Sequence, residues 1–275
     1  MRRPASNRQD KNSPPNQLTI LPAENSKLDP LSTDFVRFAR TVCSSTNHED
    51  YPVQRIGSGV VVACEGDFYL VTARHVFTNT DATPTSVVVP LSYAGVAWWP
   101  TNACIHLDAT SPFADDSTFA DLAIYSMEMT ETVRSQISEF DYLPFPVRLH
   151  LAPKQQLFAF GYPDEGSALD IEGRRLVSTL TMFEGVYGGK TSYTGIHVFE
   201  SEHLNDVDPN GMSGGPVTIL DHQRIGRHLL AGLIVQGGKH SGKLHFVDAG
   251  MLLEALRFTI PQLRELRVKG PFVND

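Results

Sequence analysis

Short apolar runs separated by turn residues make up most of the chain after residue 30. Residues 59–63 and 68–72 are rich in valine and aromatic residues, and they flank the turn Glu65-Gly66-Asp67, a pattern that predicts a β-hairpin. No helical pattern of about twelve residues alternates with these runs, which favours an all-β antiparallel barrel or sandwich over a parallel sheet. Residues 34–41 fit a first strand and a short helix equally well. Further strands are predicted at 86–90, 120–126, 157–161, 176–183, 196–200, 217–220, 229–235 and 243–247.

The two ends of the chain differ from this pattern. Residues 1–30 are rich in Pro, Asn, Ser and Gln and hold few apolar residues, which predicts a disordered tail. A helix is predicted after Asp248, which can cap it, because Leu252, Leu253 and Leu256 recur on one face. Pro261 is predicted to end this helix or to begin a second turn. The folded domain is therefore expected to span residues 31–275.

Composition narrows the class of protein. The 275 residues are 41% hydrophobic and 20% charged, as in a water-soluble globular protein, and the formal charge of −8 argues against a nucleic-acid partner. No apolar run approaches 18 residues, so no membrane span is expected, and the N-terminal residues lack the apolar stretch of a signal peptide. The three cysteines, Cys43, Cys64 and Cys104, cannot complete a disulfide framework. We expect a cytoplasmic protein, without a metal or a cofactor since no metal-ligand spacing occurs.

The segment Gly211-Met212-Ser213-Gly214-Gly215 has the form G-x-S-x-G, which also marks the nucleophile elbow of serine esterases. An elbow must lead from the serine into a helix. Here two glycines and a proline are followed by a β-branched run, which predicts a strand. An esterase also needs an acid and then a histidine after the serine, so this alternative stays open but is less favoured. The residues that could supply them are Asp221, Asp248, His228, His240 and His245.

A histidine and an aspartate precede Ser213 at positions suited to catalysis. His75 follows the predicted strand at 68–72, and Asp121 stands directly before the apolar stretch Leu122-Ala123-Ile124-Tyr125. Asp115 and Asp116 compete for the same role, but only Asp121 leads straight into an apolar strand. The remaining histidines are interpreted as surface or structural residues.

Five segments in this order resemble the trypsin-like (chymotrypsin-fold) serine proteases, in particular the small intracellular bacterial trypsin-like peptidases. They are GSGVVVA, LVTARHV, DLAIYSM, FAFGYP and GMSGGPV, and the resemblance covers about residues 35–260. It implies two antiparallel six-stranded β-barrels followed by a C-terminal helix. The implied limits are about 31–145 for the first barrel, 146–247 for the second and 248–275 for the helical segment.

The resemblance also implies roles for individual residues in cleaving a protein or peptide substrate. Ser213 attacks the peptide carbonyl, His75 accepts its proton, and Asp121 orients the imidazole. The backbone N–H groups of Gly211 and Ser213 form the oxyanion hole, which a glycine at 211 suits through its backbone freedom.

Specificity is expected to depend on the S1 pocket, which binds the residue before the cleaved bond (P1). The resemblance places its base at Val207 and one wall at Val235, Gln236 and Gly237, which favours an apolar P1 residue. A shift of one residue would instead place Asp206 or Asp208 at the base and select arginine or lysine.

One departure from the family concerns activation. Met212 stands where the secreted digestive enzymes carry the aspartate that receives a new N-terminal ammonium. Activity is therefore expected to be constitutive, or gated by loop ordering or by a regulatory protein encoded nearby. The alternative to an active peptidase is a catalytically inactive binding module with the same fold.

Overall fold

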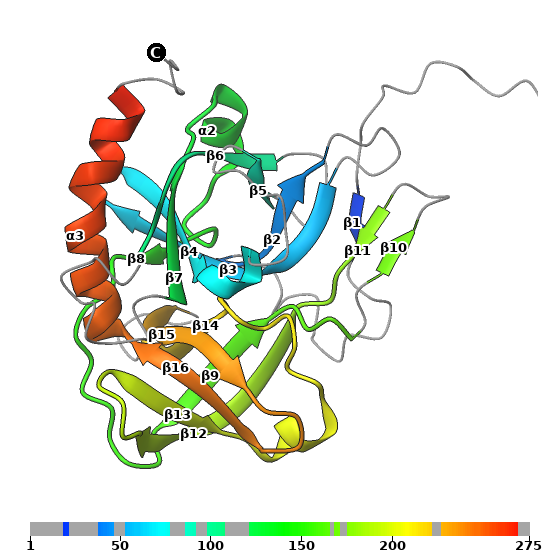
Figure 1. The fold of residues 1–275 in the computed structure, drawn as a ribbon, viewed down its shortest axis with the longest axis vertical. Coiled ribbons are helices and arrows are strands. Elements are labelled where there is room, and N and C mark those ends of the chain that lie inside the picture. Colours follow the sequence, from blue (N-terminus) through cyan, green and yellow to red (C-terminus); the bar gives the residue numbers. More distant parts are fainter. Residues whose placement is uncertain are drawn as a thin grey trace, which may run out of the picture.

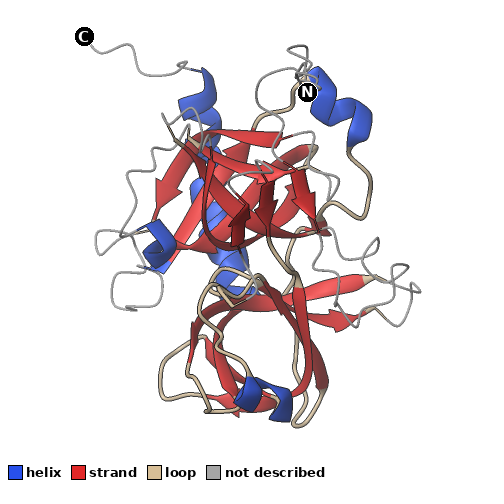
Figure 2. Ribbon diagram, turned by 90° about the vertical axis from the view of Figure 1, so that its right-hand side faces the viewer, coloured by secondary structure: helices blue, strands red, loops and turns tan. Residues whose placement is uncertain are grey.

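The computed structural model describes residues 19–21, 38–46, 53–77, 86–91, 98–107, 121–165, 168–170, 175–221 and 227–268. These residues form two closed six-stranded antiparallel β-barrels and a C-terminal helix (Figure 1). Figure 2 shows the two barrels one above the other, the lower seen along its axis. The predicted fold class is confirmed.

The first barrel closes through six strands in the order β2-β5-β6-β7-β4-β3, because β2 also pairs with β3. A short strand, β8 (Leu143–Pro144), adds to β3 in parallel. The hairpin predicted around Glu65-Gly66-Asp67 is present, with Glu65 and Gly66 at positive φ as its tight turn requires. The six strands are β2 (Ala39–Ser45), β3 (Val53–Cys64), β4 (Asp67–Ala73), β5 (Val87–Pro90), β6 (Trp98–His106) and β7 (Leu122–Met127).

The second barrel follows the order β12-β13-β16-β15-β14-β9. Five of its strands lie close to their predicted ranges. The predicted strand at 176–183 is instead two strands, β11 and β12, separated by residues 178–180. The barrel consists of β9 (Gln156–Gly161), β12 (Thr181–Lys190), β13 (Ile196–Glu200), β14 (Pro216–Leu220), β15 (His228–Gly237) and β16 (Lys243–Asp248).

Several strands read as continuous apolar runs because both of their faces are buried. On β4, Leu70 points into the first barrel, whereas Tyr69 and Val71 join a cluster between the barrels. That cluster also takes Phe160 and Leu233 from the second barrel, which has its own interior cluster. The two barrels are therefore joined by an apolar interface, along which loops from both meet.

Smaller elements complete the described chain. Strand β1 (Thr19–Leu21) pairs in parallel with β11 (Arg175–Val177), which pairs with β10 (Ala168–Asp170). The rest of the predicted tail at 1–30 lies outside the described residues, as do residues 34–37, while 39–41 belong to β2. Three short helices are η1 (Arg74–Phe77), α2 (Glu131–Gln136) and η3 (Glu202–Asp206).

Helix α3 (Ala249–Val268) follows both barrels and crosses from the second to the first (Figure 1). The cap predicted at Asp248 is confirmed: its Oδ1 accepts the N–H groups of Gly250 and Met251 at 2.6 and 3.0 Å. The prediction that Pro261 ends the helix is wrong. Pro261 removes one helical N–H donor, but the flanking Ile260 and Leu263 are buried and hold the helix in place through its end.

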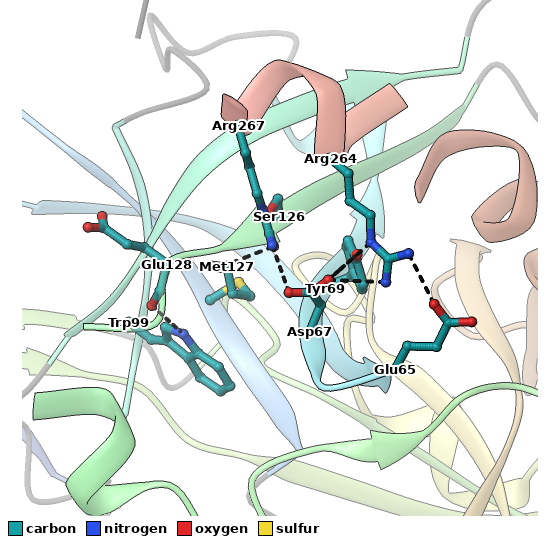
Figure 3. A network of polar contacts seen from close by, with 9 residues as sticks. All are labelled: Glu65, Asp67, Tyr69, Trp99, Ser126, Met127, Glu128, Arg264 and Arg267. Atoms are coloured by element: carbon teal, nitrogen blue, oxygen red, sulfur yellow. Dashed lines mark hydrogen bonds and ion pairs between the residues drawn. The ribbon is translucent and has the colours of Figure 1, made fainter. Parts of the chain in front are cut away.

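The last turns of α3 bind the turn of the β3–β4 hairpin through an ionic network (Figure 3). Asp67 accepts from Arg264 Nε at 3.1 Å and from Arg267 Nη1 at 2.8 Å, and Arg264 also pairs with Glu65 at 3.0 Å. The Arg267 guanidinium lies over the Tyr69 ring and donates to Ser126. Burial opposes ionisation of Asp67, but the hydrogen bonds and charges of Arg267 and Arg264 hold its pKa below the usual range. We call this network the helix clamp.

Replacing Asp67 by asparagine is expected to lower the free energy of unfolding by about 1 kcal/mol at pH 7, because two charge-assisted bonds at a partly exposed site are lost. A carboxyl whose pKa is depressed by folding stabilises above its unfolded value, and this stability disappears as pH falls through the folded value. The difference between wild type and variant in urea unfolding should therefore begin to shrink below about pH 4, the unfolded value, and vanish only once pH lies below the lowered pKa of folded Asp67. Glu65→Gln is the matched control, since the Glu65 side chain is 73% exposed. An equal loss in the control, or a loss that does not shrink as pH falls below about 4, would contradict the clamp.

Two features concern the state of the cysteines and the possibility of a membrane-spanning helix. Cys43, Cys64 and Cys104 are free thiols, and burial raises the pKa of Cys43 and of Cys104 to about 12. Among the described residues, no helix has the length and apolar character needed to cross a membrane.

Candidate active site

The pairing of β4 with β7 brings His75 and Asp121 together. Ala73 lies opposite Leu122 in this antiparallel pair, so His75, the second residue after β4, comes close to Asp121, the residue that precedes β7. His75 Nδ1 lies 2.9 Å from both carboxylate oxygens of Asp121, and the His75 backbone N–H donates to Asp121 Oδ1 at 3.0 Å. The carboxylate thus fixes both the backbone and the ring of His75. Asp115 and Asp116, the competing acids, lie outside the described residues.

This contact determines what the imidazole can do. A carboxylate only accepts hydrogen bonds, so Nδ1 carries the proton and Nε2 of the neutral ring is left as an acceptor. The hydrogen bond to Asp121 raises the pKa of His75, burial opposes this, and the charge of Asp121 raises it further. The side chain is 46% exposed, so the basic nitrogen is accessible from the surface.

Ser213 lies in the loop between η3 and β14, and the second barrel holds this loop firmly. Gly214 N–H donates to Ile234 O at 2.7 Å, and Ile234 N–H donates to Gly215 O at 2.8 Å, so the loop extends the pairing of β15. Met212 is completely buried in the core of the second barrel, an apolar environment that would not suit a carboxylate. The serine is followed by strand β14 rather than a helix, so the esterase elbow is wrong for this chain.

The same loop contacts the first barrel close to His75. Ser58 N–H donates to Ser213 O at 3.3 Å. A Cβ atom added at Gly214 would lie 2.1 Å from Ser58 O and 2.3 Å from Thr72 Oγ1, and Thr72 is three residues before His75. The Ser213 loop therefore meets the first barrel at β3 and β4, close to the end of β4 that precedes His75. Within the described part of the chain, no hydrogen bond joins the Ser213 hydroxyl to the His75 ring.

The backbone around Gly211 is arranged to leave two donors free. Gly211 has φ +87°, a conformation in which a side chain is strained. Its carbonyl accepts from the Ser58 hydroxyl at 2.7 Å, and that hydroxyl accepts from Tyr162 N–H at 2.8 Å. Among the described residues, the N–H groups of Gly211 and Ser213 donate to no protein acceptor. These two donors are therefore available to an acceptor such as a negatively charged oxygen.

A cleft of about 670 Å³ adjoins the His75–Asp121 pair. Its lining includes Val235 and Gln236, two of the four residues proposed for the S1 pocket, but not Val207 or Gly237. Val207 packs on the core of the second barrel, and Gly237 approaches Pro209 closely. The other lining residues are Thr191, Ser192, Tyr193, Ile196 and His245.

Sequence reasoning missed several residues of this site. Thr191, Ser192 and Tyr193 form an ordinary polar turn between β12 and β13, so nothing in their sequence marks them. His245 was interpreted as a surface or structural histidine, and only the pairing of β16 with β15, which places it opposite Gln236, brings it to the cleft. Ser58 could have been suspected from its place between two glycines in the first of the five segments.

Comparison with known proteins adds one match. Residues 57–226, more than half of the chain, match the family model described as a trypsin-like peptidase domain, and His75, Asp121 and Ser213 all fall inside this range. The search of curated proteins found no match.

Proposed function

Since the chain belongs to the family of trypsin-like peptidase domains, we propose that it is a serine endopeptidase. The observation that carries the proposal is the His75–Asp121 pair, together with the contact of the Ser213 loop with Ser58 and Thr72 of the first barrel. The proposed substrate is a protein or peptide, and the proposed chemistry needs no cofactor.

The proposed reaction uses each of these groups in turn. His75 Nε2 takes the proton of the Ser213 hydroxyl as the oxygen attacks the peptide carbonyl, and the resulting imidazolium is stabilised by Asp121. His75 then gives that proton to the leaving amine, and the acyl group stays on Ser213. Water attacks the acyl-enzyme with His75 again as the base, which releases the carboxylic acid and restores the serine.

In the proposed reaction, the N–H groups of Gly211 and Ser213 supply the electrostatic stabilisation of the transition state. The carbonyl oxygen becomes negative in each tetrahedral intermediate, and fixed donors stabilise that charge without having to reorient. One such donor is typically worth about 2.7–4 kcal/mol of transition-state stabilisation. The hydrogen bond from the Ser58 hydroxyl to the Gly211 carbonyl holds the loop that contains these two N–H groups.

The alternative is an inactive module that binds peptides without cleaving them. A fluorophosphonate probe separates the two, because it reacts with a serine whose base and oxyanion donors are assembled. We expect the wild-type protein to be labelled once, on the tryptic peptide that contains Ser213, by mass spectrometry. Absence of labelling across pH 6–9 would contradict the peptidase and favour the binding module.

Ser58→Ala is expected to lower kcat about tenfold with little change in KM. The Gly211 carbonyl and the Tyr162 N–H both lose their partner, so the oxyanion loop is held less firmly. Ser44→Ala is the matched control: Ser44 is also buried in the first barrel, but its hydroxyl bonds to Ser45 and Ser86, away from the loop. Equal kinetic losses in both variants would show that Ser58 acts only through general stability.

An apolar P1 residue is proposed, because Ile196 and Val235 line the cleft, while Asp208, an acid that could select a cation, already has partners. Asp208 accepts from Asn210 N–H at 3.1 Å and lies 3.6 Å from Lys239 Nζ.

In a peptide library analysed by mass spectrometry, cleavage after apolar residues should exceed cleavage after arginine or lysine by at least about tenfold, since a buried cation would stay unpaired. Dominant cleavage after arginine or lysine would overturn this and point to Asp206 or Asp208.

Two further expectations belong to the proposal. We propose a cytoplasmic location, because Cys43, Cys64 and Cys104 are free thiols. We also propose control by a protein partner, because Met212 cannot receive the N-terminal ammonium that activates secreted relatives. Cell fractionation tests the location.

A further inference from the structure

The Gly211 N–H, one of the two proposed oxyanion donors, belongs to a peptide group that is held from its other side. In a planar trans peptide the carbonyl and the N–H point in opposite directions. The carbonyl of this peptide group is that of Asn210, and it accepts a hydrogen bond from the Asp164 N–H at 2.7 Å. The position of Asp164 therefore sets the direction in which the Gly211 N–H points.

The side chain of Arg55 fixes the segment that contains Asp164. Arg55 lies on β3 of the first barrel, whereas residues 162–164 follow β9 of the second barrel. Arg55 Nη1 donates to Asp164 Oδ1 at 2.7 Å, and Arg55 Nη2 donates to the Tyr162 carbonyl. One guanidinium from the first barrel thus binds both ends of this three-residue segment of the second.

The same ion pair packs against Gly211 itself. A Cβ atom added at Gly211 would lie 2.6 Å from Asp164 Oδ1 and 2.7 Å from the Tyr162 carbonyl oxygen. It would also collide with Arg55 Nη2. The space beside the Gly211 Cα is therefore filled by the ion pair, and the backbone angles there cannot change freely without displacing it.

Burial makes the two partners unequal. The Arg55 side chain is 10% exposed, and its one ion-pair partner among the described residues is Asp164, whose side chain is 66% exposed. A buried cation that loses its partner is strongly unfavourable, so Arg55 retains the Asp164 carboxylate. Without Arg55, the Asp164 side chain would turn to water, and the backbone of residues 162–164 would lose both of its contacts with the guanidinium.

The loop before Ser213 needs a support of this kind. In the secreted relatives the aspartate at this position receives the N-terminal ammonium on activation, and Met212 cannot do so. We propose that the Arg55–Asp164 ion pair takes over this task and positions the Gly211 N–H toward the oxyanion. The inference rests on the proposed peptidase reaction. Arg55 and Asp164 are positioning residues, because they act on the oxyanion only through Gly211.

Arg55→Met and Asp164→Ala test the pair in the full-length protein. Methionine keeps the apolar stem of the arginine without its donors, and alanine keeps the Asp164 N–H without the carboxylate. On the library peptide that the wild type cleaves fastest, each variant should lower kcat between about tenfold and a hundredfold. The loss is smaller than the 10²–10³ typical of removing a donor outright, because Ser58 still holds the Gly211 carbonyl. KM should stay within about twofold, because the oxyanion forms only during the reaction.

A double variant and a control separate positioning from general stability. If the pair acts as a unit, the double variant Arg55→Met, Asp164→Ala should be no slower than Arg55→Met alone. The control is Arg267→Met in the helix clamp, where a partly buried arginine also pairs with an aspartate, Asp67, at 2.8 Å. It should lower the free energy of unfolding but leave kcat unchanged. Because the Asp164 side chain is largely exposed, Asp164→Ala is expected to fold even if Arg55→Met does not.

Hydrogen exchange measured by NMR follows the hydrogen bond itself without a substrate. In Arg55→Met the Asp164 N–H should exchange with solvent at least about tenfold faster than in the wild type, because its bond to Asn210 is no longer held. The Ile234 N–H, which donates to Gly215 O at 2.8 Å on the other side of the loop, should exchange at the wild-type rate.

The failure of this inference can be told apart from the failure of the proposed peptidase. An active wild type whose Arg55→Met and Asp164→Ala variants keep kcat would overturn the inference and leave the peptidase intact. Additive losses in the double variant, or an equal loss of kcat in Arg267→Met, would also overturn it. A wild type that cleaves nothing would contradict the peptidase, and unchanged exchange at Asp164 in Arg55→Met would then overturn the positioning role independently.

Discussion

Ser213→Ala is expected to abolish fluorophosphonate labelling and to lower kcat/KM on a peptide substrate by roughly a millionfold. The variant loses the atom that forms the acyl bond, whereas the loop keeps its backbone bonds to Ile234 and Ser58. Because the Ser213 hydroxyl has no hydrogen bond to another described residue, thermal stability should stay within about 0.5 kcal/mol of wild type.

The matched control is Ser135→Ala, at an exposed serine of α2 whose hydroxyl bonds only within its own helix. It should be labelled at the wild-type rate. A Ser213→Ala protein that still cleaves peptides at a comparable rate would end the proposal of a serine peptidase. If the wild-type protein is labelled but cleaves no peptide of any library, Ser213 is an activated serine, and the proposal of a peptidase is wrong.

Asp121→Asn is expected to lower kcat by about 10⁴-fold while leaving the fold unchanged. Asp121 Oδ1 accepts the His75 backbone N–H, so the carbonyl oxygen of the introduced amide should take over that contact. Its NH₂ group then faces Nδ1 and donates to it, which moves the ring proton to Nε2. In that tautomer the ring cannot accept the proton of Ser213.

The pH profile provides a second readout for this variant. The labelling rate of the wild type should fall at low pH as His75 becomes protonated, with a midpoint above the usual histidine value because Asp121 raises the pKa. Without the carboxylate the pKa of His75 is no longer raised. The residual activity of Asp121→Asn should therefore fall with a midpoint at a lower pH than that of the wild type. Labelling reactions stopped at set times between pH 5 and 9 measure the pH midpoint of the wild type and that of the variant. An unchanged midpoint would show that Asp121 does not act on His75.

The strands that sequence reasoning found have apolar residues at consecutive or alternate positions between turn residues. The range 196–200 matches β13 to the residue, and β9, β15 and β16 differ from prediction only at their ends. Strand β6 was missed because Pro100 and Asn102 interrupt its apolar pattern. It is held by its neighbours instead, since Pro100 pairs with Val88 and Cys104 with Tyr125. Tertiary pairing thus overrides local preference there.

For the candidate site, the sequence located the residues that have a recognisable motif. The structure places His75 against Asp121 and the Ser213 loop opposite them, while their catalytic roles remain a proposal. The contacts that hold the site could not be predicted, because they join residues far apart in the chain. The Ser58 hydroxyl reaches the Gly211 carbonyl, and Arg55 pairs with Asp164 at 2.7 Å. A single sequence contains no signal for such distances.

Helix α3 affects the order in which tertiary contacts form during synthesis of the chain. Chains fold from the N-terminus as they leave the ribosome. A nascent chain that has emerged as far as β16 contains both barrels and every lining residue of the cleft, but neither Arg264 nor Arg267. Its inter-barrel cluster also lacks Leu252 and Leu256. The barrels can therefore meet through Tyr69, Phe160 and Leu233 before α3 is made, whereas the contacts of α3 with both barrels form only after the last helix has been synthesised.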